Sequence, residues 1–160
     1  MNRNKLQRVS KDIWYEFSVF DHTAKRVHQI PENDKDFNPM LESFCLHLRN
    51  FIEFFFFSSD KEYVRAANFL QEDKTNLWEA FKKECKFDWK YYSDKANHQV
   101  AHITYSRLEF TDEKKRWPVN EIYMQVCEIL YQFLLLVESE VICTELCDWK
   151  KGYGKFTRRQ

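Results

Sequence analysis

Glycine and proline are scarce in this chain, with 2 glycines and 3 prolines among 160 residues. A protein made of many β-strands needs these residues for its tight turns, whereas helices joined by short polar loops need few of them. The scarcity therefore excludes a many-stranded β architecture and favours an all-α fold. Because 44% of the residues are hydrophobic, the chain has enough apolar side chains for one core. We expect a single all-α domain over residues 1–160.

Net charge is also missing, because 25 basic and 25 acidic side chains cancel. The molecule as a whole has no field that attracts nucleic acid or an anionic membrane, so any such contact must be local. Long uninterrupted apolar runs are absent too, since His47, Arg49 and Glu53 interrupt the phenylalanine-rich stretch. We therefore expect no membrane contact. The basic N-terminal residues are followed by no apolar stretch, so we expect a cytoplasmic protein without a secretory signal.

The 5 cysteines have no paired spacing. In a chain with this much core, such cysteines are typical of reduced thiols rather than of a disulfide framework. Cys143 and Cys147 lie one helical turn apart, a spacing at which two thiolates can share a metal. Two idle thiols on one helix explain the same spacing more simply, and we expect no cofactor.

What the chain does contain is helical periodicity. Apolar residues recur at three- and four-residue steps, which predicts a bundle of about five helices with a short additional one. The expected helices cover residues 11–29, 39–57, 60–71 (the short one), 75–85, 88–107 and 118–147. We expect Ser10 to cap the first helix. Residues 9–148 should form the ordered core, and residues 1–8 and 150–160 should be loose ends.

Aromatic residues make up 18% of the chain, including 15 phenylalanines, so large rings should fill the core. One set of side chains lies on the apolar faces of the long predicted helices and is expected to be buried together. This set is Phe44, Leu48, Phe51, Phe55, Val100, Ile103, Ile129 and Phe133.

Two segments, 46–53 and 94–102, concentrate polar groups on helices that are otherwise strongly apolar. A buried Arg or His costs several kcal/mol unless it is paired, so the simplest arrangement has the two helices satisfying each other. We therefore expect Arg49 and Asn50 to reach the turn at 97–102. An alternative is that Arg49 pairs with Glu53, one turn later on its own helix. A purely structural hydrogen-bond network would explain the same residues.

The run Lys95-Ala96-Asn97-His98-Gln99-Val100-Ala101-His102, followed by Arg107, resembles the signature helix of the HEPN superfamily. The segment 47–54 is similar to the polar and aromatic second helix of uncharacterised bacterial proteins that carry such a helix. The resemblance spans roughly residues 39 to 117. It implies a helical bundle, often a homodimer, and in many members a metal-independent endoribonuclease of toxin, phage-defence or RNA-processing systems, acting on RNA or with a cognate partner protein.

In those ribonucleases an Arg and a following His are separated by four to six residues. Counting back from His102, Lys95 holds the six-residue spacing and Asn97 the four-residue spacing. The resemblance implies that His102 is the acid or base and that Arg49 or Lys95 supplies positive charge to the phosphate. Asn97 and Glu53 would orient these groups. The expected binding residues nearby are His47, Asn50, His98 and Tyr105.

Two other functions remain open from the sequence. Asp94, His98 and His102 share one helical face and could supply three ligands of a metal site, which would need a fourth ligand such as His47 or Glu53. Alternatively, the chain is a non-catalytic interaction or structural module. Its aromatic surfaces would then bind another protein.

Overall fold

The computed structural model describes residues 2–57, 62–101, 111 and 116–157, and within these ranges the chain is helical and contains no strand. The α-helices are α1 (Arg3–Val27), α2 (Phe37–Ile52), α3 (Glu72–Glu84), α4 (Trp89–Ala96), α6 (Val119–Leu136) and α7 (Thr144–Thr157). The predicted all-α bundle is therefore confirmed. In the part of the chain that is described, every helix is too short or too polar to cross a membrane.

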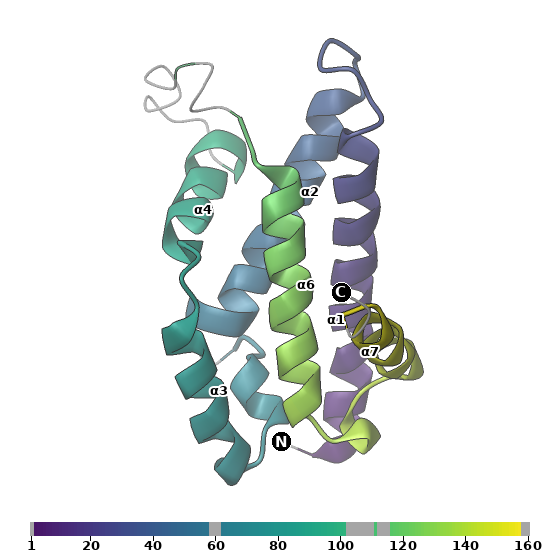
Figure 1. The fold of residues 1–160 in the computed structure, drawn as a ribbon, viewed down its shortest axis with the longest axis vertical. Helices are drawn as coiled ribbons and strands as arrows, with labels where there is room; N and C mark the ends of the chain where they lie inside the picture. Colours follow the sequence, from purple (N-terminus) through teal and green to yellow (C-terminus); the bar gives the residue numbers. More distant parts are fainter. Residues whose placement is uncertain (1, 58–61, 102–110, 112–115, 158–160) are drawn as a thin grey trace.

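The bundle is organised around α6, which runs down the middle of Figure 1. Helix α1 lies on one side of α6, and α3 and α4 follow each other along the opposite side. Helix α2 passes behind α6 and packs against both α1 and α4. α2 is therefore enclosed on two flanks. Only the surface of α2 that faces away from α1 and α4 is open to contact with another molecule.

The first helix begins earlier than the sequence predicts. Asn2 is the N-cap residue, and its side chain accepts a hydrogen bond from the backbone N–H of Asn4. Leu6 is buried against the core, which holds the first turns in place. Residues 3–8 are thus helical rather than loose, and the expectation that Ser10 caps the helix is wrong. Ser10 is buried inside α1.

The predicted single helix at 118–147 is in fact interrupted. Helix α6 ends at Leu136, a 3₁₀ turn spans Ser139–Val141 (η5), and α7 starts at Thr144. The buried Ser10 hydroxyl accepts a hydrogen bond from the backbone N–H of Cys143 at 2.7 Å, which fixes the connection against α1.

The C-terminal segment was expected to be loose beyond residue 150, but α7 is helical to Thr157. Trp149 packs edge-to-face on Phe17 of α1, with ring centres 4.9 Å apart. Gly154 lets α7 approach α6 closely, because a Cβ atom at this position would lie 2.7 Å from the Tyr131 hydroxyl. Ring packing and this close approach keep the last helix on the bundle.

Three short non-α segments complete the described chain. π-helical turns follow α2 at Glu53–Phe57 (η1) and α4 at Asn97–Ala101 (η3). The short helix predicted at 60–71 appears as a 3₁₀ turn at Ala66–Phe69 (η2), with residues 58–61 outside the described ranges. The π turn η3 lies within the polar segment 94–102, and η1 begins at Glu53, the last residue of the polar segment 46–53.

The core is aromatic at its centre, as the composition predicts. Phe133 of α6 is fully buried, and its ring lies 5.5 to 5.9 Å from four other rings: Phe54 and Phe55 of η1, Phe69 of η2 and Trp78 of α3. A second cluster joins α1 to α2, where Phe20 stacks on Phe44 with ring centres 4.8 Å apart. Such ring pairs add stability beyond the area that they bury.

The predicted core set is largely confirmed. Its buried members are Phe44, Leu48, Phe51, Phe55, Ile129 and Phe133. Val100 is only half-buried, because it lies at the rim of the α2–α4 packing. Ile103 lies outside the described residues.

Phe51 tests this core directly, because its ring packs on Phe17, Phe20 and Phe55. We expect Phe51→Ala to lower the free energy of unfolding by about 3–5 kcal/mol, as is usual for a large ring removed from a packed core. Urea denaturation followed by circular dichroism measures the change. Leu77→Ala on α3 is the control, because Leu77 is 54% exposed and should lose little stability. Similar losses in both variants would contradict the packing.

Candidate functional site

The polar residues of α2 divide between two neighbours. On the side of α1, His47 Nδ1 donates to Glu16 Oε2 at 2.6 Å, and Asn50 Nδ2 donates to the same oxygen at 2.9 Å. His47 is only 8% exposed, so this carboxylate satisfies a buried ring. The expectation that Asn50 reaches the turn at 97–102 is not what the structure shows. Its partner is Glu16, which lies on the facing helix α1.

Glu16 was not among the predicted site residues. It lies between the core positions Ile13 and Phe17 and stands at the edge of the apolar face of α1. Carboxylates are frequent at such edges of surface helices, so the position of Glu16 in the sequence does not identify it as a site residue. Only the packing of α2 against α1 shows that two polar groups converge on it.

Arg49 follows the alternative left open by the sequence. Its Nε donates to Glu53 Oε1 at 3.1 Å, one turn later along the helix and the π turn. Both side chains are about one-third exposed, so solvent weakens the pair. Arg49 and Glu53 therefore form a surface pair on the outer side of α2.

Lys95 is buried rather than presented at the surface. It is 6% exposed, and its Nζ donates to the backbone carbonyl of Arg116 and lies 4.6 Å from the centre of the Trp117 ring. Burial lowers the pKa of Lys95 because the charged form is poorly solvated there. Trp117 in turn donates from Nε1 to Gln99 at 3.0 Å. The lysine thus fastens residues 116–117 to α4.

The remaining residues of the HEPN-like helix are described only up to position 101. The side-chain oxygen of Asn97 is buried and has no hydrogen-bond partner among the described residues. His98 is exposed, and its Nδ1 donates to the backbone carbonyl of Asp94 at 2.7 Å. His102 and Tyr105 lie outside the described residues.

The metal hypothesis includes His102, which lies outside the described residues, so only its other ligands can be placed. The carboxylate of Asp94 already pairs with Lys90 at 2.8 Å. Within the described residues, no three His, Cys, Asp or Glu side chains gather closely enough to hold a metal ion. His47, the further ligand that was considered, pairs with Glu16 on the other flank of α2. These placements leave His98 and Asp94 as surface groups of one helix.

A hollow of about 400 Å³ lies where α2 meets α4 and η3. Its lining is mostly apolar and comprises Pro39, Glu42, Ser43, Cys45, Leu46, Arg49, Ala96 and Val100. Leu46 is 47% exposed on its rim. Burial raises the pKa of the Cys45 thiol, so this cysteine is not a reactive thiolate. The hollow can accept an apolar side chain.

Sequence analysis did not single out Leu46. The signal was available, because positions 39, 42, 46, 49 and 53 recur at three- and four-residue steps out of phase with the core positions. A leucine in the middle of this outer stripe stands among charged neighbours. Its exposure follows from the rotation of α2 that buries Phe44 and Leu48.

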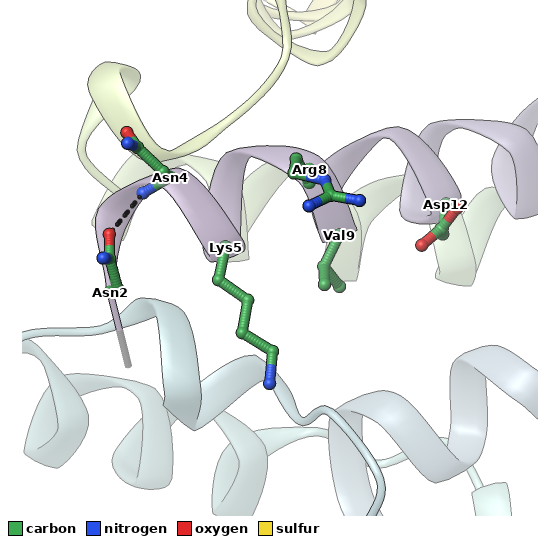
Figure 2. Close-up of a pocket in the computed structure, with 6 residues that line it drawn as sticks. All are labelled: Asn2, Asn4, Lys5, Arg8, Val9 and Asp12. Carbon is green, nitrogen blue, oxygen red and sulfur yellow. Dashed lines mark hydrogen bonds between the residues drawn. The ribbon is translucent and has the colours of Figure 1, made fainter.

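Two further hollows have different linings. One of about 630 Å³ lies along the first half of α1, between Asn2 and Asp12, and Figure 2 shows Lys5 and Arg8 projecting there. These cations are exposed, so solvent screens them. The other, of about 500 Å³, lies beside Trp117 and Phe37. Among the described residues that line these two hollows, no buried polar side chain lacks a hydrogen-bond partner.

Comparisons with family models, with curated proteins and with solved structures find no match.

Glu16 provides a test of the polar cluster on α2. We expect Glu16→Ala to lower the free energy of unfolding by about 1–2 kcal/mol, because His47 and Asn50 would lose their acceptor while water replaces it only in part. The matched control is Asp12→Ala, one turn earlier on α1, where the exposed side chain has no hydrogen-bond partner among the described residues. Urea denaturation measures both variants. Equal effects would contradict the role assigned to Glu16.

Proposed function

We propose that the protein is a non-catalytic protein-interaction module that binds its partner on the outer face of α2. The observation that carries the proposal is the exposed Leu46 beside an apolar-lined hollow. A single exposed leucine is ordinary in a monomer. Here the leucine projects next to a concave surface, and together they form the knob and hole that a helical partner needs.

The placement of the charged side chains supports the same function. Lys95 is committed to a backbone carbonyl and two aromatic rings, so its charge does not face a substrate. Arg49 is held on the outer stripe by Glu53. An interface with an apolar centre and a charged rim matches the usual anatomy of protein–protein contacts.

Site-specific photo-crosslinking in cells tests this function. We expect a photoreactive phenylalanine analogue at position 46 to give a discrete adduct, because the partner's side chains would lie against it. The same analogue at position 77 should give none, since Leu77 is equally exposed but lies on α3, away from the hollow. A chain that gives no discrete adduct at position 46 would contradict the proposal.

The second candidate function is the metal-independent endoribonuclease implied by the HEPN resemblance. One observation favours it: the signature helix changes to a π turn at Asn97, and π turns are frequent at functional sites. The buried, unpartnered oxygen of Asn97 lies in that turn. Such a group, held without a partner among the described residues, is a candidate for orienting a substrate or a catalytic side chain.

RNA cleavage by the purified chain in the presence of a chelator separates the two functions. If the ribonuclease proposal holds, His102→Ala should lower cleavage of single-stranded or hairpin RNA at least a hundredfold, as expected for loss of a general acid or base. His22→Ala on the exposed side of α1 is the matched control and should leave cleavage unchanged. Absence of cleavage, or cleavage that survives His102→Ala, would exclude His102 as catalytic.

A further inference from the structure

The hollow beside Trp117 lies at one end of the bundle, where the end of α1, the start of α2 and the start of α6 come together (Figure 1). Its volume of about 500 Å³ falls within the range of roughly 300–1,000 Å³ that is typical of small-molecule sites. Val27 and Val119 in its lining are buried, and Leu41 is half-buried. The hollow can therefore cover the apolar part of a small molecule.

Two aromatic rings, Phe37 and Trp117, also line this hollow, and both are half-buried. The orientation of Trp117 is fixed from the side of α4, because its Nε1 donates to Gln99 and Lys95 Nζ lies 4.6 Å from its ring centre. Its remaining surface faces the hollow. A ring that is already held in place loses little freedom when a ligand ring packs on it, so the hollow is prepared for an aromatic group.

Two side chains of opposite charge complete the lining. Glu32 lies in the connection between α1 and α2, and Arg116 lies in the connection that precedes α6. Both are exposed, and neither has an ion-pair partner within the described residues. A guanidinium group binds a carboxylate through two parallel hydrogen bonds, and a carboxylate accepts hydrogen bonds from an ammonium group. The hollow thus offers a place for one group of each sign.

Lys95 adds to the positive charge beside Arg116. It is 6% exposed, and its charge is held by the Arg116 carbonyl and the Trp117 ring rather than by a carboxylate of the described residues. Solvent screens a buried charge less than an exposed one. The Arg116 side of the hollow is therefore the side that favours an anionic group.

We propose that this hollow binds a free aromatic α-amino acid. The ligand's ring packs on Phe37 and Trp117, its carboxylate binds Arg116 and its ammonium group binds Glu32. A ligand with a single charge leaves one of these two side chains unmatched, whereas a zwitterion matches both. The site is separate from the outer face of α2, so this inference goes beyond the proposed interaction function.

Isothermal titration calorimetry on the full-length chain tests the ligand class. L-Phenylalanine should bind with a dissociation constant on the order of 1 mM or tighter. Phenylpropionate lacks the ammonium group and phenethylamine lacks the carboxylate, so each should bind about fivefold more weakly, as expected for loss of one solvent-exposed ion pair. L-Alanine, which lacks the ring, should give no measurable binding.

Substitutions assign each group of the ligand to its side chain. Arg116→Gln should weaken the binding of phenylalanine and phenylpropionate about fivefold and leave phenethylamine unchanged. Glu32→Gln should weaken phenylalanine and phenethylamine to a similar extent and leave phenylpropionate no weaker. Phe37→Leu should weaken all three aromatic ligands about threefold or more, because a ring pair is lost. The matched control is Arg8→Gln, an exposed arginine near the opposite end of α1.

Nuclear magnetic resonance locates the binding site. The indole N–H signal of Trp117, assigned with a Trp117→Phe variant, should shift when phenylalanine is added. Circular dichroism confirms that each variant is folded. A wild type that does not bind phenylalanine would overturn the proposal. So would binding that leaves the Trp117 signal unmoved, or binding that is as tight for both single-charge analogues as for phenylalanine.

Discussion

The burial of Phe133 is the constraint on which the rest of the fold depends. Its ring contacts aromatic side chains from η1, η2 and α3, three elements that come from the first half of the chain. A fully buried ring with this many ring neighbours leaves α6 no freedom to rotate. Because α6 packs against α1 and α3, its orientation constrains where these two helices lie. Helix α2 then packs between α1 and α4.

Helix α2 has three faces with different surroundings: the core, helix α1 and solvent. Phe44 and Leu48 face the core, while His47 and Asn50 face α1 and share the carboxylate of Glu16. The rest of its circumference is the outer stripe, the only part of α2 in the described structure that keeps a large exposed apolar side chain. This stripe is the surface at which we propose that a partner binds. His47 and Asn50, two of the binding residues expected from the sequence, are turned toward α1.

Periodicity predicted the core positions of α2 and α6 well, because a helix that must bury one face repeats its apolar residues at fixed steps. Periodicity could not predict the role of Ser10. Its hydroxyl accepts from Cys143, 133 residues away, and a residue that looks like a local cap is instead a long-range partner. The break after Leu136 was missed for the same reason. Apolar residues resume at 141–143 after the short polar stretch 138–140, so the sequence looks like one continuous helix, and the contact of η5 with α1 shows where the chain turns.

The candidate site was partly predictable. The sequence marked His47, Asn50 and Lys95 as polar groups on apolar helices, and all three have internal partners. It could not identify those partners, because Glu16 and the Arg116 carbonyl are ordinary groups until packing brings them close. Leu46, in contrast, was not marked by the sequence. Its environment is decided by the phase of the helix rather than by its own chemistry.

The π turn at Glu53–Phe57 makes the packing of the aromatic core sensitive to deletions in this segment. A π turn holds one more residue than an α turn, so it behaves as a single-residue insertion in the helix. Within it, successive phenylalanines reach different neighbours: Phe54 contacts Phe69, Phe55 contacts Trp78 and Phe56 stacks on Trp89. Deleting one residue there would return the segment to α-helical phase and turn this series of rings away from its partners. A one-residue deletion in this π turn should therefore destabilise the core more than the substitution of one aromatic ring for another.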